Sequence, residues 1–257
     1  MMIEEFMLAA NISAAKICLN QDIPSLYRIH PKPDITKIKS LEKFLRSRKI
    51  NASFDDGSDI KKLSSLIDTA KDRRDKRIIH SQILFSMSLA TYEAEVSEHY
   101  ALNYGSYTHF TSPIRRYPDV LVHRLLEQIQ KKNFGKLDKN LQKKAIYCSE
   151  QEMVAAKAER DSIKFMQIKF MQDKIGETFS GIISGVSDWG IYVEIDENKC
   201  EGMVYIKDIE DDKYYYSEQQ QAILGKKTNK KYRLGDKINI EVKKADLVKK
   251  HLDFIII

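Results

Sequence analysis

The stretch His109–Asp119, HFTSPIRRYPD, gathers two prolines, two adjacent arginines, two hydroxyl groups, a histidine and two aromatic rings in eleven residues. An arginine side chain carries a planar, permanently charged fork that can bind two phosphate oxygens at once. Thr111 and Ser112 add hydroxyl groups, and Pro118 suits the first turn of a helix whose free N–H groups would face the same region. The segment therefore predicts a phosphate-binding turn at the entrance of a helix.

A structural role is the alternative for the same residues. One arginine can pair with Asp119 or Glu127, while Phe110 and Tyr117 fill a hydrophobic core. For an Arg-Arg pair taken alone we favour this structural interpretation. Only the longer motif around the pair, described below, favours phosphate binding.

The elements that must position this turn are helical. Hydrophobic periodicity predicts helices over residues 3–19, 35–45, 60–70, 77–93, 118–129 and 141–171. Asp34 is expected to cap the second of them. From Gly176 onwards, short β-rich runs alternate with glycine and Ser-Asp turns, which is typical of a small Greek-key barrel. We therefore expect an α+β chain with two domains, 1–173 and 174–257.

Three aromatic residues stand out in the expected barrel. Trp189 lies in a turn, Tyr192 in the strand that follows, and Tyr205 in a later strand. Strand alternation can place Tyr192 and Tyr205 on one face with Trp189 at its edge. Exposed aromatic rings stack on nucleic-acid bases, at about 1–3 kcal/mol per base. Packing inside the barrel is the alternative, and periodicity alone does not separate the two.

A basic run interrupts the barrel pattern. Its positively charged residues are Lys226, Lys227, Lys230, Lys231 and Arg233. They could grip a phosphate backbone, but a charge run is more often a solvated loop, which is the interpretation we favour.

The composition limits the class of protein and its location. A formal net charge of +6 over 257 residues favours a polyanionic partner without requiring one. The three cysteines are odd in number and far apart, so no disulfide framework is expected and a reducing compartment is indicated. Acidic residues stand at the start, and no apolar run approaches the roughly 18 residues of a membrane span. We expect a cytoplasmic protein with no membrane contact.

The C-terminal part resembles the S1-motif RNA-binding domain, a five-stranded OB-fold barrel. The residues that carry the resemblance are the WG turn at 189–190, the aromatic strand after it and EGMVYIKD at 201–208. The resemblance implies that Trp189, Tyr192 and Tyr205 form the stacking face, with Asp246 and Lys250 beside it. Tyr205 stands where that family often has histidine.

The rest of the chain resembles the RNB family, the exoribonucleases of the RNase II and RNase R type. Four stretches agree with that family in order and spacing: IEEFMLAAN, YRIHPKP, YTHFTSPIRRYPDVLVHRLL and AERDSIKFMQIKFM. The match is nearer to RNase R than to RNase II and is weakest over residues 35–76. The resemblance implies processive 3′-to-5′ hydrolysis of single-stranded RNA to nucleoside monophosphates, with magnesium.

The resemblance also implies roles for individual residues. Arg115 matches the arginine that neutralises charge on the scissile phosphate, and Glu159 matches an acidic residue of the same pocket. The residues expected to contact or support RNA in the helical part are Thr111, Ser112, Arg116, Tyr117 and His123, with Asn11, Arg28 and His30 as weaker candidates.

Magnesium ligands are not expected in this chain. In the RNB family the metal-binding aspartates lie upstream of the helix that corresponds to IEEFMLAAN. The only similar cluster, FDDGSD with Asp55, Asp56 and Asp59, lies downstream in an expected loop and is not expected to bind metal.

We therefore expect the C-terminal portion of such an exoribonuclease, which binds RNA weakly by itself and needs the missing N-terminal half as a partner for activity. One alternative is a non-catalytic RNA-binding protein derived from the same fold. Another is an unstable by-product with exposed apolar surface on its first helices.

Overall fold

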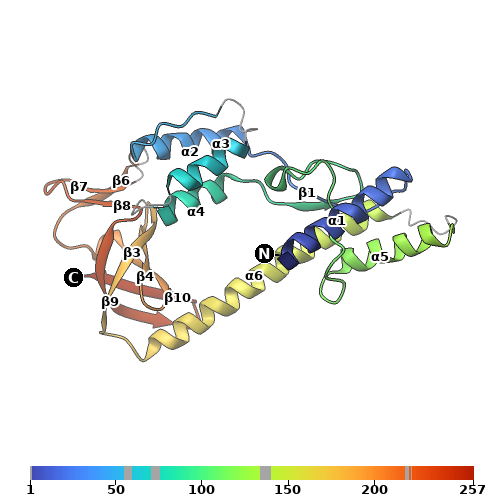
Figure 1. Cartoon of the computed structure of the whole chain (residues 1–257). Helices are drawn as coiled ribbons and strands as arrows, with labels where there is room; N and C mark the ends of the chain where they lie inside the picture. The colour runs from blue at the N-terminus through green and yellow to red at the C-terminus, as the bar shows by residue number, and fades with distance from the viewer. Residues whose placement is uncertain (1, 55–59, 71–75, 134–139, 218–219, 221) are drawn as a thin grey trace. The chain divides into compact units, whose positions relative to one another are not determined.

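The computed structural model describes residues 2–54, 60–70, 76–133, 140–217, 220 and 222–257. The chain forms two compact units, each assembled from segments that are distant in the sequence (Figure 1). The first unit contains Met1–Glu42, Ala52–Asp68 and Ile83–Ala156, and the second contains Lys43–Asn51, Thr69–Gln82 and Lys157–Ile257. Helices and a closed β-barrel confirm the expected α+β fold class.

The first unit is built around helices and a two-stranded sheet. Its main helices are α1 (Met2–Asn20), α5 (Tyr117–Gln130) and the N-terminal part of α6 (Leu141–Gln172). β1 (Tyr27–Ile29) pairs antiparallel with β2 (Thr91–Glu93). These elements share a core of buried residues: Ala14, Leu26, Tyr92, Val122, Ala145 and Cys148.

Three further helices lie between β1 and β2 along the chain: α2 (Ile35–Ser47), α3 (Ile60–Thr69) and α4 (Lys76–Ser86). α2 buries Ile38, Leu41, Phe44 and Leu45, the i, i+3, i+6 and i+7 spacing of one helix face. A short 3-10 helix, η1 (Tyr100–Leu102), follows β2. None of the helices in the described part of the chain is long and apolar enough to cross a membrane.

Asp34 caps α2 as expected from the sequence. Its carboxylate accepts the backbone N–H of Thr36 at 2.7 Å, which satisfies one of the free N–H groups of the first turn. We expect Asp34→Ala to lower the free energy of unfolding by about 1 kcal/mol, measured by urea denaturation. Asp34→Ser, which retains a capping oxygen, should lose less than half of that. Equal losses in the two variants would contradict the capping role.

The prediction of a helix over residues 77–93 is correct up to Ser86 and wrong beyond it. α4 ends at Ser86, whose hydroxyl donates to the carbonyl of Ile83 at 2.6 Å, and residues 91–93 form β2. Tyr92 is buried in the core of the first unit, and its backbone N–H donates to the hydroxyl of Ser149 at 2.9 Å. Pairing with β1 and burial of Tyr92 outweigh the local helical preference.

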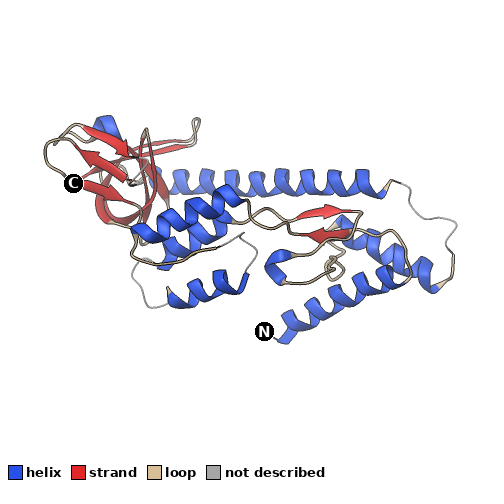
Figure 2. Ribbon diagram, turned by 90° about the horizontal axis from the view of Figure 1, so that it is seen from above, coloured by secondary structure: helices blue, strands red, loops and turns tan. Residues whose placement is uncertain are grey.

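A closed five-stranded barrel dominates the second unit, in the order β10-β5-β4-β3-β9. Its strands, red in Figure 2, are β3 (Thr178–Ser187), β4 (Gly190–Ile195), β5 (Glu201–Tyr205), β9 (Lys237–Asp246) and β10 (His251–Ile256). β10 runs parallel to β5, and the other neighbours are antiparallel. The predicted five-stranded barrel is confirmed, while the division into domains 1–173 and 174–257 stays a prediction.

The basic run between β5 and β9 is exposed, as the favoured interpretation expects, but it is only partly a loop. Three of its lysines, Lys226, Lys227 and Lys230, lie in the turn between β7 (Ala222–Gly225) and β8 (Lys231–Arg233), and the other two basic residues lie in β8. β6 (Tyr214–Ser217), β7 and β8 form an antiparallel sheet. The carboxylate of Asp212 accepts the backbone N–H groups of Thr228 and Lys227 at 2.7 and 2.8 Å, which lowers the pKa of Asp212 to about 2. Lys230 pairs with Asp211 at 2.7 Å. Phosphate binding by this segment stays a prediction.

Candidate nucleic-acid interface

The arginine turn is fixed by one buried carboxylate. Asp119, which is 0% exposed, accepts two hydrogen bonds from Arg116, from Nε and Nη2, both at 2.9 Å. It also accepts the backbone N–H of Ser112 at 2.7 Å. The carbonyl of Ser112 in turn accepts the N–H groups of Arg115 and Arg116. Asp119, in the first helical turn of α5, therefore fixes the backbone at Ser112, where the arginine segment begins to turn.

The two arginines consequently have different roles. The structural interpretation, in which one arginine pairs with Asp119, is confirmed for Arg116. Arg115 is exposed, and its side chain makes no hydrogen bond or ion pair with any described residue. Its neighbour Tyr117 is 47% exposed. The turn thus presents one unpaired guanidinium and one aromatic ring to a ligand.

The remaining expected residues of the turn lie close to its base. The hydroxyl of Thr111 is buried and has no hydrogen-bond partner among the described residues. His123 Nε2 donates to the carbonyl of Phe110 at 2.8 Å, and the two rings stack with centroids 4.1 Å apart. Thr111 retains a free donor, whereas His123 stabilises the backbone and the ring of Phe110.

Buried polar side chains contact the arginine turn, and most of them were not predicted from the sequence. His109 Nδ1 and the hydroxyl of Tyr92 are 2.8 Å apart. Asn11 donates to the hydroxyl of Tyr107 at 2.8 Å and accepts the N–H of Phe110 at 2.9 Å. The Asn11 side chain therefore connects α1 to the arginine turn.

Burial dominates the ionisation of these side chains. It lowers the pKa of His109 to about 3, with the charges of Arg116 and Arg28 acting in the same direction. Burial likewise lowers the pKa of His99 to about 4 and raises that of Tyr92 to about 12. Both histidines are therefore neutral at physiological pH, and neither adds positive charge to the site.

The weaker candidates Arg28 and His30 have protein partners. Arg28 forms a bidentate ion pair with Glu152, at 2.5 and 2.9 Å, and lies over the ring of Tyr92. His30 donates to the carbonyl of Ser88 at 2.7 Å and accepts the N–H of Ala101 at 3.0 Å. Both side chains hold the first unit together.

The barrel presents a second candidate surface. Along β4, Ile191, Val193 and Ile195 are buried, so Tyr192 points outward and is 39% exposed. Tyr205 points outward from β5, and Trp189, in the turn before β4, is 76% exposed. None of the three belongs to the barrel core. The alternative in which they pack the interior is therefore wrong, and their binding of RNA stays a prediction.

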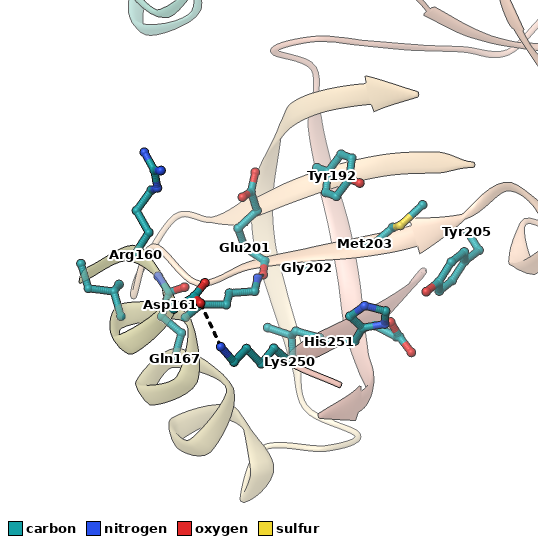
Figure 3. Close-up of a pocket in the computed structure, with 14 residues that line it drawn as sticks. Arg160, Asp161, Gln167, Tyr192, Glu201, Gly202, Met203, Tyr205, Lys250 and His251 are labelled. Atoms are coloured by element: carbon teal, nitrogen blue, oxygen red, sulfur yellow. Dashed lines mark hydrogen bonds and ion pairs between the residues drawn. The ribbon is translucent and has the colours of Figure 1, made fainter. Parts of the chain in front are cut away.

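Residues of α6 and the β9–β10 hairpin adjoin this face (Figure 3). Lys250 pairs with Asp161 of α6 at 3.1 Å. The carboxylate of Asp246 accepts the N–H groups of Lys249 and Val248, and these bonds, the former above all, lower its pKa. Asp246 thus shapes the hairpin turn that carries Lys250.

Glu159 is exposed on α6, and its side chain makes no hydrogen bond or ion pair with any described residue. It belongs to the second unit, whereas Arg115 belongs to the first. Across the described ranges, no group of three or more His, Cys, Asp and Glu side chains could hold a metal ion. The FDDGSD cluster lies outside the described residues apart from Phe54. The described residues therefore contain no set of side chains that would hold a magnesium ion.

Two family models match the chain. The RNB domain model matches residues 1–132, about half of the chain, and the S1 RNA binding domain model matches residues 172–256. The chain belongs to the RNB family. The resemblance that the arginine motif carries is thereby confirmed, and so is the S1-type barrel of this RNB-family chain.

Individual proteins agree with the family assignment. Ribonuclease R of Thermotoga maritima is 36% identical over 263 residues, which cover 100% of this RNB-family chain and 37% of that protein. The apo form of Mycoplasma genitalium RNase R is 30% identical, with a TM-score of 0.92, and the match covers 100% of this chain and 41% of that one. Its complex with ribose-methylated single-stranded RNA gives 29% identity and a TM-score of 0.91, with the same coverage. The chain thus spans well under half the length of these relatives.

Proposed function

We propose that this chain is the C-terminal portion of a ribonuclease R-like exoribonuclease, which degrades single-stranded RNA from its 3′ end to nucleoside monophosphates. The observation that carries the proposal is the exposed, unpaired Arg115, held on a turn that the buried Asp119 fixes. The similarity to RNase R over the whole chain, including a structure with single-stranded RNA, supports it.

Within this proposal, the guanidinium of Arg115 binds oxygens of the scissile phosphate and stabilises the negative charge that develops there. Arg116 acts indirectly, because its bond to Asp119 positions the turn. Glu159 contributes a carboxylate to the same reaction. Thr111, Ser112 and Tyr117 border the phosphate, and the barrel aromatics stack on bases of the strand.

We propose that the upstream part of the nuclease is the partner of this chain and supplies the metal ligands. α1 exposes large apolar side chains near its start: Met2, Ile3 and Phe6 are 73%, 71% and 66% exposed. An apolar surface of this kind is normally covered by protein.

The three buried free cysteines support a reducing, cytoplasmic location.

The test joins this chain to the upstream part of ribonuclease R in one polypeptide and follows a labelled single-stranded RNA with magnesium. We expect nucleotide release, and Arg115→Ala should lower kcat by about 10²- to 10³-fold with little change in RNA affinity, because the lost interaction belongs to the transition state. Arg124→Ala, an exposed arginine on α5, is the matched control and should change kcat less than twofold. Equal effects of the two substitutions would contradict the role of Arg115.

A non-catalytic RNA-binding protein is the second candidate, and the barrel favours it. The exposed Trp189 and Tyr192 and the half-buried Tyr205 lie on the outside of the barrel, which needs no residue from another protein. This candidate predicts salt-sensitive RNA binding and no nucleotide release even when the upstream part is joined to the chain. The unstable by-product predicts aggregation of the purified chain instead, which light scattering would detect.

A further inference from the structure

A pocket of about 490 Å³ lies between α6 and the outer face of the barrel, within the second unit (Figure 3). α6 contributes Arg160, Asp161, Lys164 and Gln167, and the barrel contributes residues of β4, β5 and β10. The pocket adjoins the aromatic face, because Tyr192 and Tyr205 line it. A base stacked on that face would therefore have this pocket beside it.

Strand register places a carboxylate of the pocket lining, that of Asp253, beside the aromatic face. Tyr192 lies opposite Met203, Met203 opposite Asp253, and Asp253 opposite Lys244. The neighbours of Asp253 along β10, Leu252 and Phe254, point into the barrel core, so the Asp253 side chain points outward. The register shifts between Asp253 and Phe254, where Lys243 of β9 has no partner on β10, so the pairing is irregular beside Asp253.

Asp253 differs from the other acidic residues of the pocket. Asp161 pairs with Lys250, and Glu201 accepts a hydrogen bond from Ser184. Oδ1 of Asp253 is buried and accepts no hydrogen bond from any described residue. The nearest lysines along β9 pair elsewhere, Lys243 with Asp208 at 2.8 Å and Lys244 with Asp246 at 3.1 Å.

A buried acceptor without a donor is costly, which indicates that a ligand or water donates to Asp253 when the site is filled. An ionised carboxylate accepts hydrogen bonds only and has two oxygens side by side. Among the RNA bases, guanine alone presents two adjacent N–H donors, N1–H and N2–H, on its Watson–Crick edge. Adenine and cytosine present one amino group next to a ring acceptor, and uracil presents one N–H between two carbonyls.

We propose that this pocket is a guanine-selective subsite, in which the Asp253 carboxylate turns so that both oxygens face the pocket and accepts N1–H and N2–H of a base that stacks against Tyr192 or Tyr205. The inference rests on the proposed function to the extent that it requires the barrel face to bind single-stranded RNA. Arg160, exposed at the rim of the pocket, is placed to meet the phosphate of that nucleotide.

The experiment measures binding of the full chain to labelled oligouridine decamers with one central G, inosine, A or C, by fluorescence anisotropy. We expect the G decamer to bind about 5- to 20-fold more tightly than the A, C and all-U decamers, the range expected of one bidentate base contact. Inosine, which lacks the N2 amino group, should bind with intermediate affinity. This comparison uses the unmodified protein and does not depend on the folding of a variant.

Asp253→Asn replaces one acceptor oxygen by a donor and should abolish the preference for the G decamer over the all-U decamer. Asp196→Asn, which removes the same charge from the turn after β4 and does not line the pocket, should keep the preference. Binding of all decamers with equal affinity would overturn the guanine subsite but not RNA binding by the barrel. Failure of every decamer to bind would overturn both, and an unchanged G preference in Asp253→Asn would overturn the role of Asp253.

Discussion

Replacement of Asp119 by alanine is expected to lower the free energy of unfolding by about 3 kcal/mol, the cost of breaking a buried ion pair by removing one partner. The carboxylate is fully buried and accepts three hydrogen bonds, two from Arg116 and one from the N–H of Ser112. Alanine would leave both donors without their acceptor. The Arg116 side chain is 20% exposed and regains some hydration, which keeps the loss near the lower end for such pairs.

Urea denaturation followed by far-UV circular dichroism would measure this loss. Trp189 is the only tryptophan and reports on the barrel, so the far-UV signal is the better probe of the helical first unit. Glu127→Ala is the matched control, because Glu127 lies on the same helix and pairs with Lys131 while both side chains are more than half exposed. That exposed pair should cost less than about 0.5 kcal/mol. A loss in Asp119→Ala no larger than in Glu127→Ala would show that another contact holds the turn.

The elements with local signals could be predicted from the sequence. The cap at Asp34, the proline in the first turn of α5 and the strand alternation around Tyr192 each depend on neighbouring residues only. The pairing of β1 with β2 could not, because Arg28 and Tyr92 meet across 64 residues and the local pattern around Tyr92 is helical. Short strands that depend on distant partners leave a weak pattern in the sequence.

The candidate sites also combine features that could be predicted from the sequence with features that could not. The arginine motif predicts a phosphate-binding turn, but only the structure shows that the Arg116 side chain is paired and that of Arg115 is not. Asp253 is one of many acidic residues in the sequence. It differs because one of its oxygens is buried and accepts no hydrogen bond from a described residue, and this depends on packing, which the sequence does not show. His99 and His109 likewise gain their unusual ionisation from burial that no local pattern reveals.

Acidification from pH 7.5 to pH 5 is expected to destabilise the first unit by roughly 4 kcal/mol, about 2 kcal/mol for each of these two histidines. Their pKa values are about 4 and about 3 in the folded chain, mainly because of burial, against an ordinary value of 6.5. Between about pH 4 and pH 6.5 the unfolded chain therefore binds more protons than the folded one. The free energy of unfolding consequently falls as the pH falls through this window. Above pH 6.5 these histidines no longer lower it.

The test is urea denaturation at several pH values, again followed by far-UV circular dichroism. Carboxyl groups with lowered pKa, such as Asp34, Asp212 and Asp246, add their own acid sensitivity only near and below their ordinary value of 3.8 and leave the upper window to the histidines. His99→Gln and His109→Gln should each remove about half of the slope between pH 6 and pH 5, even if they lower stability at pH 7.5. His251→Gln, an exposed histidine of the barrel, should leave the slope unchanged. A free energy of unfolding that is constant from pH 7.5 to pH 5 would mean that both rings gain water or a carboxylate partner when they are protonated, so that burial does not hold them neutral.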